Sequence, residues 1–162
     1  MKTWLLFVAI CLIPALGGCS NPLSPNNPAG TNTSIDEEYR QHIANSLSLQ
    51  SSIASDLANW YQQKSDTQQE FPEPATTHFQ NALQDDGDVL MDLIRRQKFI
   101  EDNNRVPQQF FRSNDVLRGS LMELSNAIAQ MMDGAKNRNI QTINSGEEIF
   151  KSAIAKLDKI PK

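Results

Sequence analysis

Apolar residues recur at helical spacing in four stretches of this chain, and no stretch alternates apolar and polar residues as a half-buried strand does. Proline, asparagine and glycine separate the stretches, within residues 72–74, 103–107 and 133–139. Helices of roughly 20–30 residues joined by short turns usually pack antiparallel. The pattern therefore predicts an all-α protein, an antiparallel four-helix bundle, with a break in the second or third helix left open.

The first predicted helix begins after Ser34 and ends near Lys64. Ser34 and Glu37 have the spacing of a capping box, in which each side chain bonds the other residue's backbone N–H. Residues at intervals of three, four or their sums are expected on its inward face: Ile35, Tyr39, Ile43, Leu47, Ile53, Leu57 and Trp60.

The second predicted helix starts after Pro72 and Pro74 and ends at Asn103, because proline fits the first turn of a helix but not its interior. Glycine at position 87 costs a helix about 1 kcal/mol, so a bend or break at 85–88 is one alternative. The expected inward residues are Phe79, Leu83, Val89 or Leu90, Leu93 or Ile94, and Ile100.

The third predicted helix follows Pro107 and ends at 133–134, with a restart near 113–115 as an alternative. The fourth spans 139–159, unless a second capping box at 145–148 shortens it. The expected inward residues are Phe110, Leu117, Leu121, Leu124, Ile128 and Met131 in the third helix, and Ile140, Ile143, Phe150, Ile154 and Leu157 in the fourth.

Residues 1–18 have the parts of a secretory signal peptide: Lys2, an apolar run, and small residues before Cys19. The run, 4–16, is about 13 residues long and too short for the roughly 20 that span a bilayer. Leu16-Gly17-Gly18-Cys19 resembles the lipobox of bacterial lipoproteins. That resemblance implies cleavage before Cys19, a diacylglyceryl group on its thiol and often a fatty acyl group, such as palmitate, on its amine.

The lipobox resemblance also implies a place for the protein and a division of the chain. Ser20, after the cysteine, implies the outer membrane in a cell with two membranes and the outer face of the plasma membrane in a cell with one. Residues 19–34 are expected to form the lipidated cysteine and a flexible linker, since 20–34 carry no charge and little apolar mass. Residues 35–162 then form a single helical domain.

The composition of the mature chain excludes several classes of function. Removal of residues 1–18 leaves 14 basic and 19 acidic side chains, a net charge of −5, which argues against binding to nucleic acid. Cys11 leaves with the signal peptide and Cys19 is lipidated, so no thiol remains for a disulfide, a nucleophile or a metal. Elbow motifs for a catalytic serine and phosphate-binding glycine loops are also missing from the sequence.

The histidines and the acidic run at 85–88 do not match known metal motifs. His42 and His78 lack the glutamate three residues earlier that di-iron bundles use. We expect His42 on an exposed flank beside Glu38, and substitution of either histidine to be silent. The acidic run lacks calcium-hand ligands and is expected to be an acidic helix turn. We therefore expect no metal, no cofactor and no enzymatic activity.

Basic residues gather around the second predicted turn of this acidic chain: Arg95, Arg96, Lys98, Arg105, Arg112 and Arg118. One interpretation is a patch for an acidic partner, lipid headgroup or glycan. The other, which is the commoner outcome, is a solvated surface with helix pairs such as Asp92 and Arg96. In an up-down-up-down bundle this turn lies at the end where the first helix begins, beside the tether.

The sequence leaves two main hypotheses for function. The first is a membrane-tethered interaction or scaffolding module of the cell envelope, with an envelope protein as its partner. In size and layout it is similar to pilotins, small helical lipoproteins that escort secretion channels, although no motif is shared. The alternative is a sensor that binds a small molecule or ion between the bundle helices.

Overall fold

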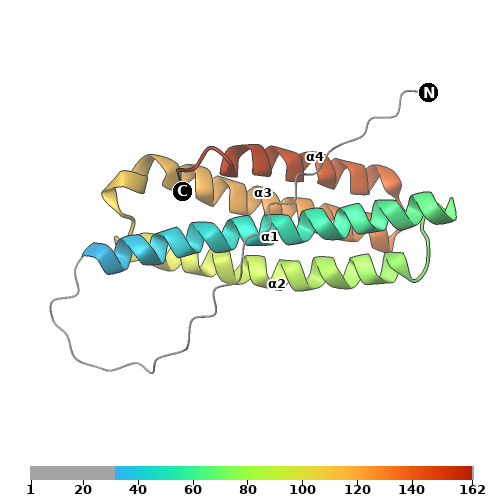
Figure 1. The fold of residues 1–162 in the computed structure, drawn as a ribbon, viewed down its shortest axis with the longest axis horizontal. Helices are drawn as coiled ribbons and strands as arrows, with labels where there is room; N and C mark the ends of the chain where they lie inside the picture. Colours follow the sequence, from blue (N-terminus) through green and yellow to red (C-terminus); the bar gives the residue numbers. More distant parts are fainter. Residues whose placement is uncertain (1–31, 162) are drawn as a thin grey trace, which may run out of the picture.

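The fold, in a computed structural model that describes residues 32–161 and the side chains of 35–161, is built from helices. This part of the chain contains no strand. It contains four α-helices and a short 3-10 helix η1 before the third: α1 (Asn32–Thr67), α2 (Ala75–Asp102), η1 (Gln108–Phe110), α3 (Phe111–Lys136) and α4 (Ile140–Leu157). They run up and down in alternation (Figure 1). The predicted antiparallel four-helix bundle is confirmed.

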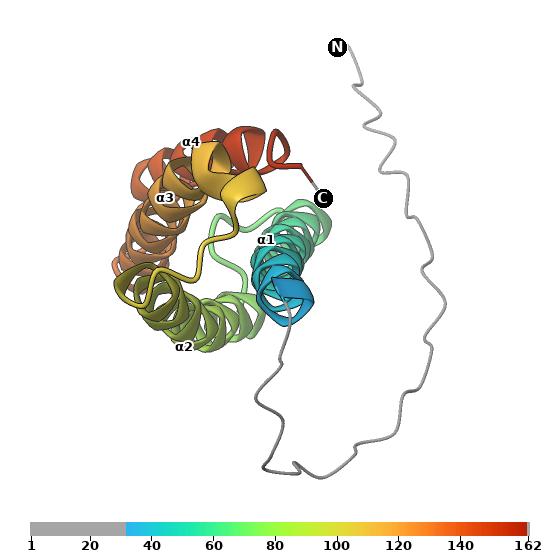
Figure 2. The same cartoon turned by 90° about the vertical axis from the view of Figure 1, so that its left-hand side faces the viewer.

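The helices follow one another around the bundle axis in chain order (Figure 2). The start of α1 and the α2–α3 turn, residues 103–110, lie at one end of the bundle, as Figure 1 shows. We call this the tether end, because α1, which follows the expected linker in the sequence, begins there. Among the described residues no helix combines the length and the apolar character needed to cross a membrane.

Close packing of α3 on α4 depends on two glycines within these helices. A Cβ added to Gly134 would lie 2.7 Å from Cγ1 of Ile143, and one added to Gly146 would lie 2.7 Å from Cγ of Met131. Real side chains do not approach so closely. The two helix backbones therefore contact each other at positions where only a hydrogen fits.

The core contains most of the residues predicted to face inward. All six predicted for the third helix are buried, as are Tyr39, Ile43, Ile53, Leu57 and Trp60 of α1. In α1, however, Leu49 is buried and Leu47 only partly so, because the inward face follows a seven-residue repeat through Tyr39, Ser46, Ile53 and Trp60. In α2, Leu90 and Leu93 face inward, whereas Val89 is half-exposed.

Three of the alternatives for helix boundaries are wrong. Helix α2 passes through Gly87 without a break, α3 passes through 113–115, and α4 passes through Ser145, whose hydroxyl donates to the carbonyl of Gln141 within the helix. The side chain of Asn139 instead caps α4 by accepting hydrogen bonds from two backbone N–H groups. The capping box predicted at Ser34 lies outside the residues whose side chains are described.

Candidate functional site

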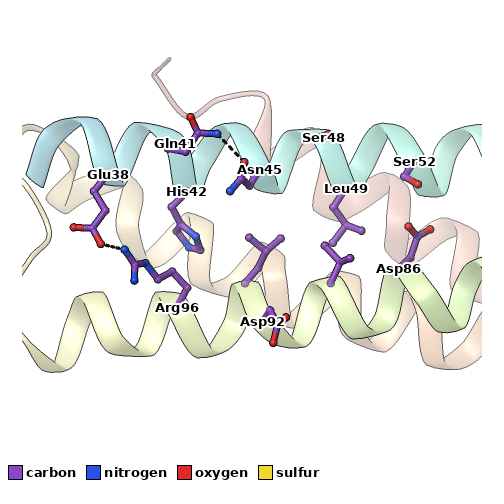
Figure 3. Close-up of a pocket in the computed structure, with 12 residues that line it drawn as sticks. Glu38, Gln41, His42, Asn45, Ser48, Leu49, Ser52, Asp86, Asp92 and Arg96 are labelled. Carbon is purple, nitrogen blue, oxygen red and sulfur yellow. Dashed lines mark hydrogen bonds and ion pairs between the residues drawn. The ribbon is translucent and has the colours of Figure 1, made fainter. Parts of the chain in front are cut away.

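An open groove of about 740 Å³ runs between α1 and α2, and we call it the α1–α2 groove. Figure 3 shows that its walls come from facing sides of the two helices. Most of the residues that line it are polar, and the apolar ones are Leu49, Val89 and Leu93. The polar lining residues are Glu38, Gln41, His42, Asn45, Ser48 and Ser52 of α1, and Asp86, Asp92 and Arg96 of α2.

His42 lies in the wall of this groove and is buried, which corrects the expectation of an exposed flank. Only 3% of the residue is exposed, and Nε2 lies 3.0 Å from Oε1 of Gln97. The amide nitrogen of Gln97 donates to Glu101 and to Asn114. Oε1 of Gln97 is therefore the acceptor, and Nε2 of His42 carries the proton. Burial lowers the pKa of His42, against the opposing effect of Gln97, so the ring is neutral at neutral pH.

The hydrogen bonds of His42 continue into a network that joins three helices. The hydroxyl of Tyr39 donates to Oδ1 of Asn114 over 2.8 Å, and the amide nitrogen of Asn114 donates to Glu101 over 2.7 Å. Burial raises the pKa of Tyr39, with smaller contributions from nearby carboxylates, and keeps its phenol protonated. In this network, which lies near the tether end, the one buried side-chain atom without a hydrogen-bond partner is Nδ1 of His42.

Asp86 is the second buried polar side chain of the groove. Residues 85–88 form an acidic turn within α2, as the sequence predicts. Asp86 itself, however, is only 6% exposed. Its Oδ2 has no hydrogen-bond partner in the described part of the chain. Burial raises the pKa of Asp86 to about 6; Asp56 and Asp85 also raise it, while the hydroxyl of Ser52, which faces Asp86 in Figure 3, lowers it.

A signal for these buried polar residues exists in the sequence. The buried residues of α2 follow alternating steps of three and four, and Asp86 and Gln97 occupy positions of that series: Thr76, Phe79, Leu83, Asp86, Leu90, Leu93, Gln97 and Ile100. A prediction from apolar residues alone misses Asp86 and Gln97. Their spacing from the buried apolar residues of α2 nevertheless indicates that they face inward.

The basic residues of the predicted patch are mostly bound to carboxylates of the same chain. Arg96 and Arg105 both pair with Glu38 of α1, and Arg118 pairs with Glu101 and Asp115. Two pairs form within α2, between Arg95 and Asp92 and between Lys98 and Asp102. Since exposed pairs contribute about 0–1 kcal/mol each, their main effect is to reduce the positive charge at the surface.

The six predicted patch residues lie on different sides of the bundle. Arg96 and Arg105 lie toward α1, where they contact Glu38. Lys98 and Arg118 line the junction of α2 with α3. Arg112 lies between α3 and α4, in a hollow shared with Lys156 and Lys159. The sequence placed these residues around one turn, but the helices project them in different directions.

Large apolar side chains are well exposed on several sides of α2 and α3. Among the described residues every large apolar side chain that is well exposed belongs to one of these helices: Val89, Met91, Phe99, Phe111, Val116 and Met122. Phe111 and Met122 are 59% and 58% exposed. They line two adjoining hollows of about 320 and 240 Å³ that share Glu101 and Arg118. We call this surface the α2–α3 seam.

Metal ligands do not cluster in the described residues, where no three side chains of His, Cys, Asp or Glu are placed to hold a metal ion. Comparison of the chain with protein families, with curated protein sequences and with solved structures finds no match. The described residues form an all-α bundle that carries the α1–α2 groove and the α2–α3 seam.

Proposed function

We propose that this protein is a lipid-anchored module of the cell envelope whose helical domain binds another envelope protein and catalyses no reaction. The lipobox-like sequence before Cys19 supports the anchor, and Ser20 supports the outer membrane as the site in a two-membrane cell. Two or more acyl chains hold a protein firmly to a bilayer. The bundle then needs no membrane-binding face of its own and is free to present its sides to a partner.

The observation that carries the binding function is the exposure of two large apolar side chains, Phe111 and Met122, in the adjoining hollows of the α2–α3 seam. Exposed apolar surface is typical of interaction sites, and in the described residues α1 and α4 expose no large apolar side chain to a comparable degree. The α2–α3 seam suits an amphipathic helix of the partner. Its apolar face would cover Phe111 and Met122, and its charged flank would meet Lys98, Glu101 and Arg118.

Capture of the partner from detergent-solubilised membranes tests this function. We expect Met122→Glu and Phe111→Glu each to reduce recovery of the partner at least about tenfold, because a carboxylate then enters an apolar contact. Both side chains are exposed, so stability should change by no more than about 0.5 kcal/mol. Ala155→Glu, at an exposed position of α4, is the matched control and should leave capture unchanged.

Two outcomes would contradict the proposal. The first is full capture by both seam variants. The second is a captured species that proves to be a further copy of this chain, shown by a dimer that Met122→Glu dissociates in size-exclusion chromatography with light scattering.

A second candidate function is a sensor for a small molecule in the α1–α2 groove. It is favoured by two buried acceptor atoms in the groove wall, Nδ1 of His42 and Oδ2 of Asp86, which have no donor in the described part of the chain. A ligand that raises the melting temperature of the protein, but not that of a Val89→Trp variant with the groove filled, would support it. The same shift in both proteins would contradict it.

A further inference from the structure

The hydrogen-bonding chemistry of the α1–α2 groove restricts what can bind there. Gln97 requires the proton of His42 on Nε2, so Nδ1 presents a lone pair and can only accept. The carboxylate of Asp86, once ionised, also only accepts. Both residues are more than nine-tenths buried and line the groove. A ligand that satisfies both must carry hydrogen-bond donors.

The charge of the groove favours a cation. The lining contains three carboxylates, those of Glu38, Asp86 and Asp92, and one basic side chain, that of Arg96. Arg96 is already paired with Glu38. In the described part of the chain no ion pair reaches Asp86, and Asp56 adds a second carboxylate beside it. An ammonium group at this position would reduce the repulsion between the two carboxylates. The side chain of Asp86 lines the groove and faces Ser52 (Figure 3).

The length and the middle of the groove indicate an extended, aliphatic ligand. Ser52, opposite Asp86, follows His42 by ten residues of α1, which is about 15 Å at 1.5 Å per residue. The apolar residues of the lining are Leu49, Val89 and Leu93, and Figure 3 shows Leu49 on α1 between His42 and Ser52. A compact polar molecule cannot reach both acceptors, whereas a methylene chain can cover the apolar segment between them.

We propose that the α1–α2 groove binds a linear aliphatic polyamine. One ammonium group lies against Asp86, the methylene chain crosses the apolar segment, and a second amine donates a hydrogen bond to Nδ1 of His42. This inference rests on the second candidate function, and it is independent of the partner on the α2–α3 seam.

Calorimetric titration of spermine into the mature lipidated protein, in non-ionic detergent and at low salt, tests the inference. We expect saturable binding that Asp86→Asn weakens at least about tenfold, since a hydrogen bond to a charged group is lost. Asp88→Asn removes the same charge from an exposed position of α2 that does not line the groove and should change the affinity less than about twofold. Equal effects of the two variants would show diffuse attraction to an acidic surface and overturn the proposal.

A second pair of variants tests the position of the chain. Val89→Lys places a cation in the groove wall and should abolish binding, while Met91→Lys, at a similarly exposed position of α2 that does not line the groove, should not. Both sites are exposed, so both variants should keep the wild-type melting temperature. Retention of binding in Val89→Lys would place the ligand elsewhere.

The ligand's length and source are tested with shorter and blocked amines. Spermine should bind more tightly than propylamine, and the gain in affinity should exceed what the larger charge of spermine alone would give. Spermine should also bind more tightly than a blocked lysine amide. Equal affinity of the lysine amide would reassign the site to a side chain of a protein partner and overturn the polyamine. If spermine fails to bind while another compound gives a melting shift that Val89→Trp abolishes, the polyamine is wrong and the sensor function stands.

Discussion

His42 and Asp86 occupy positions at which neighbouring turns of their helices carry leucine, isoleucine or tyrosine. Polar groups at such positions cost free energy unless they find partners. His42 has a partner for one ring nitrogen, whereas Asp86 is relieved by retaining its proton well above the usual pH for an aspartate. At the scale of single residues, the groove thus contains groups that are suited to a ligand and unfavourable without one.

Asp86→Asn should stabilise the protein, and the gain should depend on pH. The pKa of Asp86 is about 6 in the folded protein, above its value in the unfolded chain. The folded state therefore holds this proton more tightly, and stability is lost as the pH rises from about 4 to about 6. Asparagine resembles the protonated acid. The variant should match the wild type near pH 4 and exceed it by about 2 kcal/mol above pH 6.5.

Denaturant titrations of both proteins across this pH range measure the difference. Asp88→Asn, on the same acidic turn but exposed, serves as the control and should stay within about 0.5 kcal/mol of the wild type. A gain that is the same at every pH would show that Asp86 is not the titrating group.

His42→Ala should destabilise the protein by about 2–4 kcal/mol, in contrast to the silent substitution expected from the sequence. The change opens a cavity in the bundle and leaves Oε1 of Gln97 without its donor. His78 is exposed, so His78→Ala should change stability by less than about 0.5 kcal/mol. Urea denaturation followed by circular dichroism distinguishes the two. Equal stability of the two variants would refute the network around His42.

At the scale of helices, the pair α3–α4 differs from the other pairs because glycine allows its backbones to touch. Gly134 and Gly146 both face the opposite helix, whereas an added Cβ at Gly119 of α3 would meet nothing within 4 Å. These three glycines are all inside helices, where glycine is intrinsically unfavourable. Substitution of each glycine by alanine should improve the helix propensity in the same way. The effects on stability should differ because the added methyl group clashes at Gly134 and Gly146 but not at Gly119.

Gly146→Ala should destabilise the protein by about 2 kcal/mol, since its methyl group would lie 2.9 Å from the carbonyl oxygen of Ala127 and force the helices apart. Gly119→Ala should instead stabilise it by about 0.5–1 kcal/mol. Thermal melts and denaturant titrations of the two variants provide the comparison. Stabilisation of both would mean that α3 and α4 pack less closely than described.

At the scale of the whole molecule, the proposed binding surfaces run along the bundle from the end at which α1 begins (Figure 1). The α1–α2 groove extends from Glu38 near the start of α1 to Ser52, and the α2–α3 seam extends from Asn104 in the α2–α3 turn to Met122. A partner or ligand on the sides would be reached without displacing the protein from the membrane. Loss of the anchor should therefore change where the protein is, with little effect on its folding.

Cys19→Ser should abolish lipidation, because the thiol that would receive the diacylglyceryl group is gone. Metabolic labelling with a fatty-acid probe should give a labelled wild type and an unlabelled variant, and the variant should keep its signal peptide uncut, which its larger mass shows. Equal labelling of the two proteins would exclude Cys19 as the lipidated residue.

The helices and most of their inward faces could be predicted from the sequence, because they depend on local rules. Prolines at 72, 74 and 107 separate helices, and a period of three to four residues orients the apolar side chains of α3 without error. Leu47 was misassigned because the stripe in α1 passes through a polar residue, Ser46, which apolar counting skips. Continuity through Gly87 could not be read locally either, since burial of Leu83 and Leu90 on either side of it holds the helix against the bundle and offsets the weak helix propensity of glycine.

The groove and the charge pairs were decided by the tertiary structure alone. His42 meets Gln97 across 55 positions of sequence, and the arginines at 96 and 105 converge on Glu38 from another helix. A helical period says which side of its own helix a residue occupies, but not which polar group of another helix faces it. That depends on the relative height and rotation of the packed helices, which the side chains of all four together determine.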